Sequence, residues 1–280
     1  MSARSPRIDE RAARRAFERA ASGYEAAARL ESEVGARLRE RLDFVKLSPR
    51  RILDAGSGPA REARALARRY RGAQVLALDF ALGMLPRRGL FQRLTGRGAL
   101  AVCADLARLP LAAGSVELVW SNMALHWVND PLAAFREFER VLAPEGLVLF
   151  STLGPDTLKE LRAAAGAASV HDFTDMHDLG DMLVASGLTN PVMEMETLSI
   201  DYAGADQLIA DLRASGQTNA RADRRRGLAA RAYGERLRTA LERAPRMTYE
   251  VVYGHAWKRR AAQPTADSAV KTVRVFKRIS

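Results

Sequence analysis

The sequence predicts an α/β fold in which a parallel sheet carries helices on both faces. Three observations predict it. A short apolar run, RILDA, passes through a glycine-rich turn directly into an amphipathic helix. Further apolar runs follow along the chain, and polar or helical stretches separate them. A length of 280 residues, of which 48% are hydrophobic, is enough to bury one substantial core. Strands that alternate with helices pair in parallel and are covered on both faces.

The expected elements follow one another in order. Residues 8–42 repeat apolar side chains near the 3.6-residue period, which predicts helices that precede the core. Apolar runs bounded by turn residues then predict strands, and Pro144 is expected to end the helix before the fifth strand. The predicted strands are 51–55, 74–80, 99–105, 116–122, 147–153, 191–202 and 247–257, and the predicted later helices are 130–144 and 176–187.

We expect one domain with four parts. Residues 153–175 and 203–247 interrupt the alternation, and the second stretch separates the last two strands. An insertion at the carboxyl end of a strand is a natural lid over a binding site. The expected parts are N-terminal helices (1–44), a cofactor-binding core (45–152), a C-terminal half with a lid insertion (153–258, with the lid at 203–247) and a tail (259–280).

Composition limits the compartment and the partners. The single cysteine, Cys103, excludes an internal disulfide and is typical of a reducing compartment. The first twenty residues hold no secretory apolar run, and no stretch approaches the ~18 apolar residues of a membrane span. We therefore expect a cytoplasmic protein with no membrane partner. The net charge of +11 would attract an acidic partner. No stripe of alternating aromatic and basic residues is visible, so we expect no nucleic-acid partner.

The turn after the first strand predicts a nucleotide site. Gly56 and Gly58 leave room for a ligand to approach the backbone closely. Asp79 ends the next strand, 21 positions beyond Gly58, where a carboxylate can accept hydrogen bonds from a ribose diol. A dinucleotide would favour a third glycine near its pyrophosphate, but Pro59 and Ala60 follow Gly58.

The sign of charge favours a cationic cofactor. Asp54 stands just before the turn, where a carboxylate would repel a pyrophosphate and attract the ammonium or sulfonium region of S-adenosylmethionine. Asp105 ends the third strand and is placed to accept from an adenine amino group, with Leu106 beside the ring; alone, Asp105 could equally cap a helix. The candidate cofactor residues are Asp54, Gly56, Gly58, Asp79, Phe80, Asp105, Leu106 and Asn122.

The segments LDAGSGPAR, LALDF, CADLARLPL, WSNMALHW and LAPEGLVLFSTLGPDTLKELR resemble the motif series of class I methyltransferases over roughly residues 45–162. Segments outside that range, among them FERAASGYEAAA, FTDMHDLGDMLVASGL, DLRASGQTN and YEVVYGHAWK, are similar to the malonyl-[acyl carrier protein] O-methyltransferases of biotin synthesis. This resemblance spans nearly the whole chain. It implies a Rossmann-like, seven-stranded sheet with helices on both faces and a helical lid insertion.

The resemblance also implies a reaction. A member of the family methylates the free carboxylate of a malonyl thioester on acyl carrier protein, giving a methyl ester that primes pimelate synthesis. Acyl carrier protein is acidic, which suits a basic chain. A carboxylate titrates near ~4 and is already ionised at neutral pH, so no general base is needed. By its place in DLRASGQTN, Arg213 is expected to hold the malonyl carboxylate.

Two further residues receive roles by the same comparison. Tyr24 is expected to close over the cofactor or substrate, although an ordinary core-facing aromatic is an equal reading. His126, beside Trp127, is expected to position or pack. His171 and His177 lie near several aspartates, but their spacing matches no recognised ligand pattern, so we expect no metal.

Three rival functions stay open. A similar scaffold belongs to a complex I assembly protein that hydroxylates an arginine. A methyltransferase of RNA or of another small molecule would carry the same cofactor motifs, although no Asn-Pro-Pro-Tyr type of motif is present. A cofactor-binding assembly factor without turnover would also keep the three aspartates.

Overall fold

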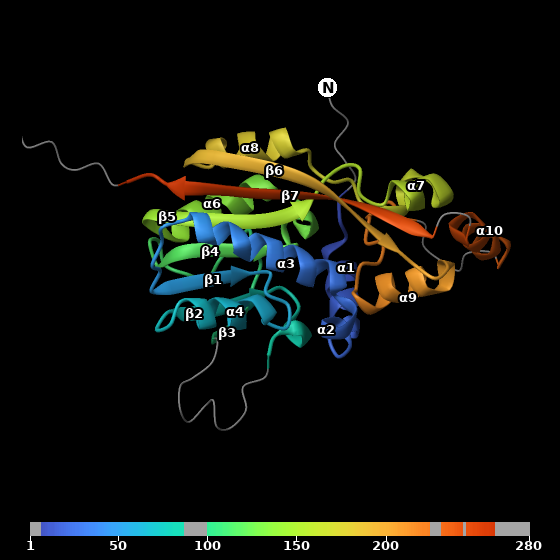
Figure 1. Ribbon diagram of the computed structural model, residues 1–280, viewed down its shortest axis with the longest axis horizontal. Helices are drawn as coiled ribbons and strands as arrows, with labels where there is room; N and C mark the ends of the chain where they lie inside the picture. The colour runs from blue at the N-terminus through green and yellow to red at the C-terminus, as the bar shows by residue number, and fades with distance from the viewer. Residues whose placement is uncertain (1–6, 87–99, 225–230, 243–244, 261–280) are drawn as a thin grey trace, which may run out of the picture.

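The computed structural model describes residues 7–86, 100–224, 231–242 and 245–260 (Figure 1). Its centre is a seven-stranded sheet in the order β3-β2-β1-β4-β5-β7-β6. The strands are β1 (Arg51–Ala55), β2 (Gln74–Asp79), β3 (Leu100–Cys103), β4 (Val116–Asn122), β5 (Leu142–Leu153), β6 (Leu188–Asp201) and β7 (Arg246–Lys258). The predicted seven-stranded α/β fold is therefore confirmed.

The sheet is mixed, which corrects the expectation of parallel pairing throughout. The pairs among β1 to β5 are parallel. β7 enters between β5 and β6 and runs antiparallel to both. Antiparallel neighbours do not require a helical crossover, so the segment between β6 and β7 is free to build something other than a covering helix.

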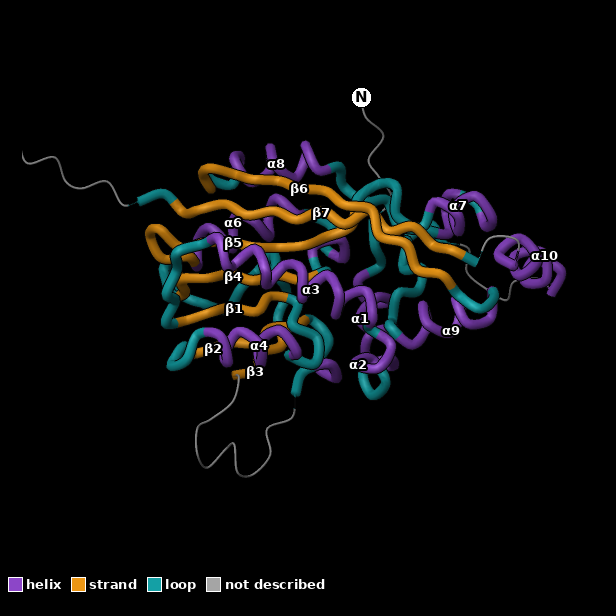
Figure 2. The backbone as a smooth tube through the Cα atoms, in the orientation of Figure 1, coloured by secondary structure: helices purple, strands orange, loops and turns teal. Residues whose placement is uncertain are grey.

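Helices cover both faces of the sheet (Figures 1 and 2). Side chains alternate along each strand, so Ile52 packs toward α3 and α4 while Leu53 packs toward α6 and α8. Val34 and Leu66 represent the first layer, and Phe138 represents the second. The helices are α1 (Glu10–Ala20), α2 (Tyr24–Ala27), α3 (Arg29–Arg41), α4 (Arg61–Arg69), α6 (Pro131–Val141), α7 (Lys159–Ala165), α8 (Met176–Ala185), α9 (Ala205–Ala214) and α10 (Arg231–Glu242).

Pro144 does not end the helix before the fifth strand, contrary to the sequence prediction. Helix α6 already ends at Val141, and Pro144 lies inside β5. The pairing of β4 with β5 shifts register at this point, and Glu145 has a positive φ of 63°. An irregular stretch of this kind tolerates proline because the ladder hydrogen bond is already lost there.

The carboxyl ends of the parallel strands face a group of helices at one end of the molecule. In Figure 1, α1 and α2 lie beyond these strand ends, and α7, α9 and α10 extend further along β6 and β7. Residues 203–247, expected as a lid, connect β6 to β7 at this end. Residues 261–280 of the expected tail lie outside the described residues. Among the described helices, none is both long and apolar enough to cross a membrane.

Candidate active site

A cavity of about 380 Å³ opens at the carboxyl ends of β1, β2 and β4. This volume lies in the range of small-molecule sites. The turn after β1 contributes Gly56 and Gly58, and the end of β2 contributes Asp79 and Phe80. α1 covers one side of it. Further lining residues include Glu10, Arg11, Arg14, Phe17, Tyr24, Glu31, Asp105, Leu106, Arg108, Asn122, Trp127, Asn129 and Gln217.

The turn after β1 has the backbone conformation that its glycines were predicted to allow. Gly56 has a φ of +80°, and a Cβ built there would overlap the Cβ of Ala124. Gly58 has a φ of +51°, and its amide donates to Oδ2 of Asp79 at 2.9 Å. The positive φ favours glycine at both positions, and at Gly56 the lack of space excludes any side chain. The turn is therefore held in place by the carboxylate that ends β2.

Asp79 is suited to bind a ribose. Its Oδ1 accepts from the Ala81 amide at 2.9 Å, so each carboxylate oxygen has one backbone donor and keeps a free lone pair. Burial raises the pKa of Asp79 to about 6, although the backbone hydrogen bonds from Ala81 and Gly58 oppose that rise. Two ribose hydroxyls would add donors to the charged form and lower the pKa again.

Asp54 lies in a recess directly behind the glycine turn. Gly56, Gly58, Tyr24, Glu31 and Asn122 line both this recess and the main cavity, so the two spaces adjoin. Asp54 is 1% exposed, and its Oδ2 has no hydrogen-bond partner among the described residues. Burial raises the pKa of Asp54 well above its ordinary range, and the carboxylates of Glu62 and Asp79 also raise it.

The recess therefore favours a cation. A buried carboxylate without a partner is costly unless a positive group or a proton neutralises it. Glu62 is already paired, since Nη1 of Arg39 lies 2.6 Å from its Oε1. Oδ2 of Asp54 has no partner of this kind among the described residues. These residues fit the ammonium-bearing end of S-adenosylmethionine.

Glu31 and Gln217 were not found from the sequence. The side-chain amide of Gln217 donates to Oε1 of Glu31, and Asn122 donates to the Glu31 carbonyl at 2.9 Å. Burial raises the pKa of Glu31. Together they join α3, the end of β4 and the segment after α9 around the cavity. A single Glu in an amphipathic helix carries no sequence signal of such a role.

Aromatic rings form another wall of the cavity. The ring of Phe17 lies 5.0 Å from that of Trp127 and 5.7 Å from that of Phe80, both in edge-to-face geometry. Tyr24 lies 6.4 Å from Phe17. The cavity wall thus combines α1 with the loop after β4. Aromatic pairs of this geometry form a firm apolar surface beside a nucleoside or an acyl chain.

The N-terminal arm is fixed over the cavity by backbone pairing. The Asp9 amide donates to the Ala220 carbonyl at 2.7 Å, and the Ala222 amide donates to the Arg7 carbonyl at 2.7 Å. Asn129, which lines the cavity, accepts from the Ile8 amide at 2.7 Å. The arm that leads into α1 is therefore held by residues that follow α9 and by the loop after β4.

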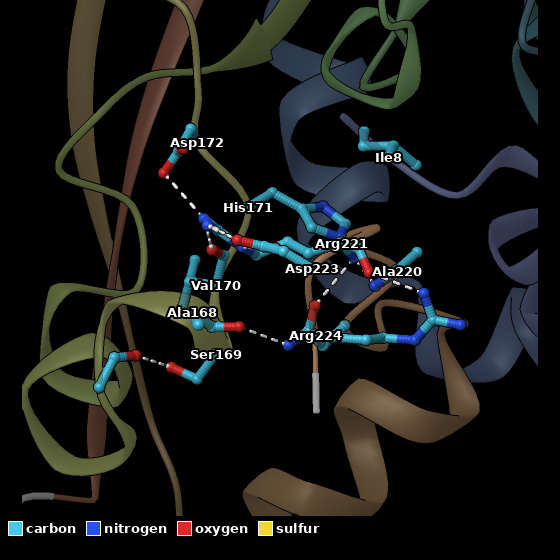
Figure 3. A network of polar contacts seen from close by, with 12 residues as sticks. Ile8, Ala168, Ser169, Val170, His171, Asp172, Ala220, Arg221, Asp223 and Arg224 are labelled. Atoms are coloured by element: carbon cyan, nitrogen blue, oxygen red, sulfur yellow. Dashed lines mark hydrogen bonds and ion pairs between the residues drawn. The ribbon is translucent and has the colours of Figure 1, made fainter. Parts of the chain in front are cut away.

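Figure 3 shows the polar network behind this contact. Arg221, 6% exposed, lies 3.1 Å from Oδ1 of Asp172 and 2.9 Å from Oδ1 of Asp223. Nε2 of His171 accepts from the Ala220 amide at 2.9 Å, and the His171 ring packs on Trp127 at 4.7 Å. Burial lowers the pKa of His171 to about 4, and Arg221 also lowers it. His171 is thus a neutral structural residue.

The chain is similar in sequence to known methyltransferases. A family model described as a methyltransferase domain matches residues 53–150. A malonyl-[acyl-carrier protein] O-methyltransferase of a Methylovorus species is 50% identical over 274 residues, covering 93% of each chain. That of Gallionella capsiferriformans is 50% identical over 265 residues, covering 90% of this chain and 91% of the relative. The chain belongs to the malonyl-[acyl-carrier protein] O-methyltransferase family.

Membership of this family confirms the prediction of an S-adenosylmethionine-dependent methyltransferase. The YcgJ protein of Bacillus subtilis, a solved structure, agrees on the fold with a TM-score of 0.58 at 16% identity, covering 79% of this chain and 97% of that one. That likeness concerns the fold alone.

Most predicted cofactor residues line one space. Gly56, Gly58, Asp79, Phe80, Asp105, Leu106 and Asn122 all line the main cavity, and Asp54 lines the recess beside it. Asp105 caps no helix: it stands in a short turn that an isolated bridge to Arg108 closes, and its Oδ1 accepts from the Ala107 amide at 2.9 Å. The assignment of each residue to a part of the cofactor remains a prediction.

Arg213 lies away from this space. It lines a separate groove on the other side of α1 and does not line the main cavity. Gly216, with a φ of +72°, reverses the chain after α9, so Gln217 faces the cavity while Arg213 faces the groove. The expected contact between Arg213 and a carboxylate beside the cofactor does not agree with this position. Tyr24, its expected companion, does line the cavity.

His126 has the environment of a packing residue. It lines none of the described cavities, and its ring lies 5.9 Å from that of Phe173 and 5.7 Å from that of Trp127. Burial lowers the pKa of His126 to about 3. In the part of the chain that the structure describes, no three His, Cys, Asp or Glu side chains gather in a way that could hold a metal.

Proposed function

We propose that this protein methylates the free carboxylate of a malonyl thioester carried on acyl carrier protein, with S-adenosylmethionine as methyl donor. The observation that carries the proposal is the joined cavity and acidic recess, in a chain 50% identical over nearly its full length to relatives named for this reaction. The methyl ester removes one negative charge from the acyl group. The product would be the primer for pimelate in biotin synthesis.

The site suits a nucleophile that needs no base. When bound, S-adenosylmethionine supplies an electrophilic methyl group and departs as a neutral thioether. A malonyl carboxylate is ionised at neutral pH and attacks directly. The carboxylate therefore carries no proton that a base would have to remove. His126 is also a poor base, because its pKa is about 3, and it does not line the cavity. The protein's task is to align the carboxylate and to exclude water, which its aromatic wall and α1 favour.

The carboxylate needs a cationic partner within the cavity. Arg11, Arg14 and Arg108 line the cavity, whereas Arg213 does not. The guanidinium carbon of Arg14 lies 6.0 Å from the centre of the Phe80 ring, and no ion pair involves Arg14 among the described residues. We therefore propose that Arg14 takes the role first expected of Arg213, since its planar fork can bind a carboxylate in a fixed orientation.

An acidic carrier protein would complement the charge around the entrance. The chain carries a net charge of +11, and Arg11, Arg14 and Arg19 are exposed on α1. Charge of opposite sign accelerates the encounter of two proteins. Cys103 is a free exposed thiol, which suits the reducing conditions of the cytoplasm, the proposed compartment.

Mass spectrometry would test the proposal. The protein is incubated with methyl-labelled S-adenosylmethionine and malonyl-acyl carrier protein, and we expect one labelled methyl per carrier, released by mild alkali as an ester. Arg14→Ala should raise KM for the carrier by about tenfold or more, without changing affinity for the cofactor. Arg15→Ala, an equally exposed arginine of α1 outside the cavity, is the control.

Three outcomes would contradict the proposal. Malonyl carrier could stay unmodified while RNA or another small molecule is methylated. A protein arginine could be hydroxylated, as in the assembly-protein relative. The protein could bind the cofactor and transfer nothing, which would leave a binding role alone.

A further inference from the structure

A shallow groove of about 420 Å³ lies on the side of α1 that faces away from the cofactor cavity. Its floor is made of small side chains, Ala16 and Ala20 of α1 and Ala214 at the end of α9. Arg19 and Arg213 stand beside it. A floor of alanines leaves a channel suited to a thin chain rather than to a bulky side chain.

The groove and the cofactor cavity share a wall. Ala16 lines the groove while the next residue, Phe17, lines the cavity. Gly23 lines the groove while Tyr24 lines the cavity. The segment after α9 follows the same pattern.

In that segment, Thr218 lines the groove and Gln217 lines the cavity. A Cβ built on Gly216 would lie 2.9 Å from the Phe17 ring, so this segment packs closely on α1. The groove and the cavity are separate spaces, and Phe17, Tyr24 and Gln217 are the residues of their common wall that face the cavity.

The charges at the groove are not neutralised within the described chain. Arg19 and Arg213 are both exposed, and neither forms an ion pair with another described residue. Arginines elsewhere are paired, for example Arg39 with Glu62 and Arg246 with Asp201. Two guanidinium groups beside this channel, with the hydroxyls of Ser22 and Thr218 at the same groove, form a donor set that a phosphate would satisfy.

We propose that this groove binds the phosphate of the prosthetic arm through which a carrier protein presents its acyl group. The arm is a slender phosphodiester chain, so the alanine floor accepts its width while Arg19 and Arg213 pair with its single phosphate. The acyl end would enter the cavity by displacing the side chains of Phe17, Tyr24 and Gln217. In this arrangement Arg213 binds the phosphate of the carrier-bound substrate in the groove, and does not bind the malonyl carboxylate in the cavity. The inference rests on the proposed function, because only a carrier-bound substrate brings such an arm.

Binding of two small probes tests this role without any methyl transfer. We would measure the dissociation constants of 4′-phosphopantetheine and of pantetheine, which lacks the phosphate, for the full chain saturated with S-adenosylhomocysteine. Neither probe carries a malonyl carboxylate. We expect the wild-type protein to prefer the phosphorylated probe by about tenfold or more. Arg19→Ala and Arg213→Ala should each remove most of this preference, and Arg213→Lys should retain part of it.

The control is Arg15→Ala, because Arg15 is an exposed arginine of the same helix that does not line the groove. It should keep the wild-type preference, and all variants should bind S-adenosylhomocysteine as tightly as the wild-type protein. Equal binding of the two probes to the wild-type protein would overturn the inference. So would an equal loss in Arg15→Ala, which would indicate diffuse attraction to a basic surface, or stronger competition by a short RNA than by phosphopantetheine.

The test also separates this inference from the proposed function. If malonyl carrier is methylated but the phosphate preference is absent, only the groove assignment fails. If malonyl carrier is never methylated, the proposed function fails whatever the probes do.

Discussion

Replacement of Asp79 by asparagine offers the sharpest test of the cofactor site, because one side chain both holds the glycine turn and faces the cavity. Each carboxylate oxygen accepts one backbone N–H, from Gly58 and from Ala81, at 2.9 Å. An amide has only one acceptor oxygen, so Asp79→Asn places its NH₂ against one of these donors. An unsatisfied buried donor costs about 1–3 kcal/mol.

Asp79 should also make the stability of the ligand-free protein decrease as the pH rises. Burial raises the pKa of Asp79 from 3.8 to about 6, so the folded protein holds this proton more tightly than the unfolded chain. The stability that this raised pKa contributes is fully present below pH 3.8 and is lost as the pH rises through 6. The difference lowers the free energy of unfolding by about 3 kcal/mol at pH 7 and by about 1.5 kcal/mol at pH 5. The wild-type protein should therefore gain about 1.5 kcal/mol over Asp79→Asn on acidification from pH 7 to pH 5.

Cofactor affinity should change in the opposite direction with pH. Ribose hydroxyls bind best to the charged carboxylate, so affinity should fall as the pH drops below about 6, where Asp79 takes up its proton. Loss of a hydrogen bond to a charged group should weaken binding by about 10- to 150-fold in Asp79→Asn. Isothermal titration calorimetry with S-adenosylhomocysteine, and urea denaturation followed by tryptophan fluorescence, measure the two effects.

The matched control is Asp43→Asn, since Asp43 is an exposed residue whose partner is Arg69, and it does not line the cavity. It should keep wild-type affinity. If Asp79→Asn bound S-adenosylhomocysteine as tightly as the wild-type protein, with the same dependence on pH, Asp79 would not be the ribose ligand. The assignment of the cavity to the cofactor would then be wrong.

Three further predictions use other parts of the same structure. Asp54→Asn should raise the thermal stability of the ligand-free protein at pH 7, because a buried charge is removed, yet weaken S-adenosylmethionine binding by more than about tenfold; unchanged affinity in calorimetry would exclude Asp54 from the site. Gly56→Ala should abolish cofactor binding through overlap with Ala124, whereas Gly72→Ala, where φ is +93° and no neighbour lies within 4 Å, should cost only about 1–2 kcal/mol and bind normally. Arg221→Ala should lower the free energy of unfolding in urea by about 2–4 kcal/mol; a loss below about 0.5 kcal/mol would mean that the network of Figure 3 adds nothing to stability.

The sequence carried the local signals of the fold and of the cofactor turn. Strand β4 has the predicted limits, and the glycine turn after β1 lies where its spacing to Asp79 required. Both are local patterns, in which neighbouring residues fix the geometry. The antiparallel insertion of β7 was not predicted, because β6 and β7 read as apolar runs whatever their direction.

The site was harder to predict where it depends on contacts between distant segments. Glu31 and Gln217 are 186 positions apart in the chain, and the residues around each of them look like those of an ordinary helix or loop. Arg213 shows the same limit, since its motif indicates a role but not the side of α1 that it faces. That side depends on how α9 packs against α1, which is a contact between segments distant in the sequence.

The acidic recess explains why a stable protein keeps an unfavourable group. Asp54 is buried with an unpartnered oxygen, and Glu62 and Asp79 oppose its ionisation. An apolar residue of similar size would stabilise the ligand-free chain better. If the ammonium of the cofactor binds there, as we propose, it would remove the repulsion, and the carboxylate that weakens the empty protein would strengthen the complex. Stability of the fold and affinity for a cationic cofactor would then be opposed at this position, which is a cost that the proposed cofactor site would explain.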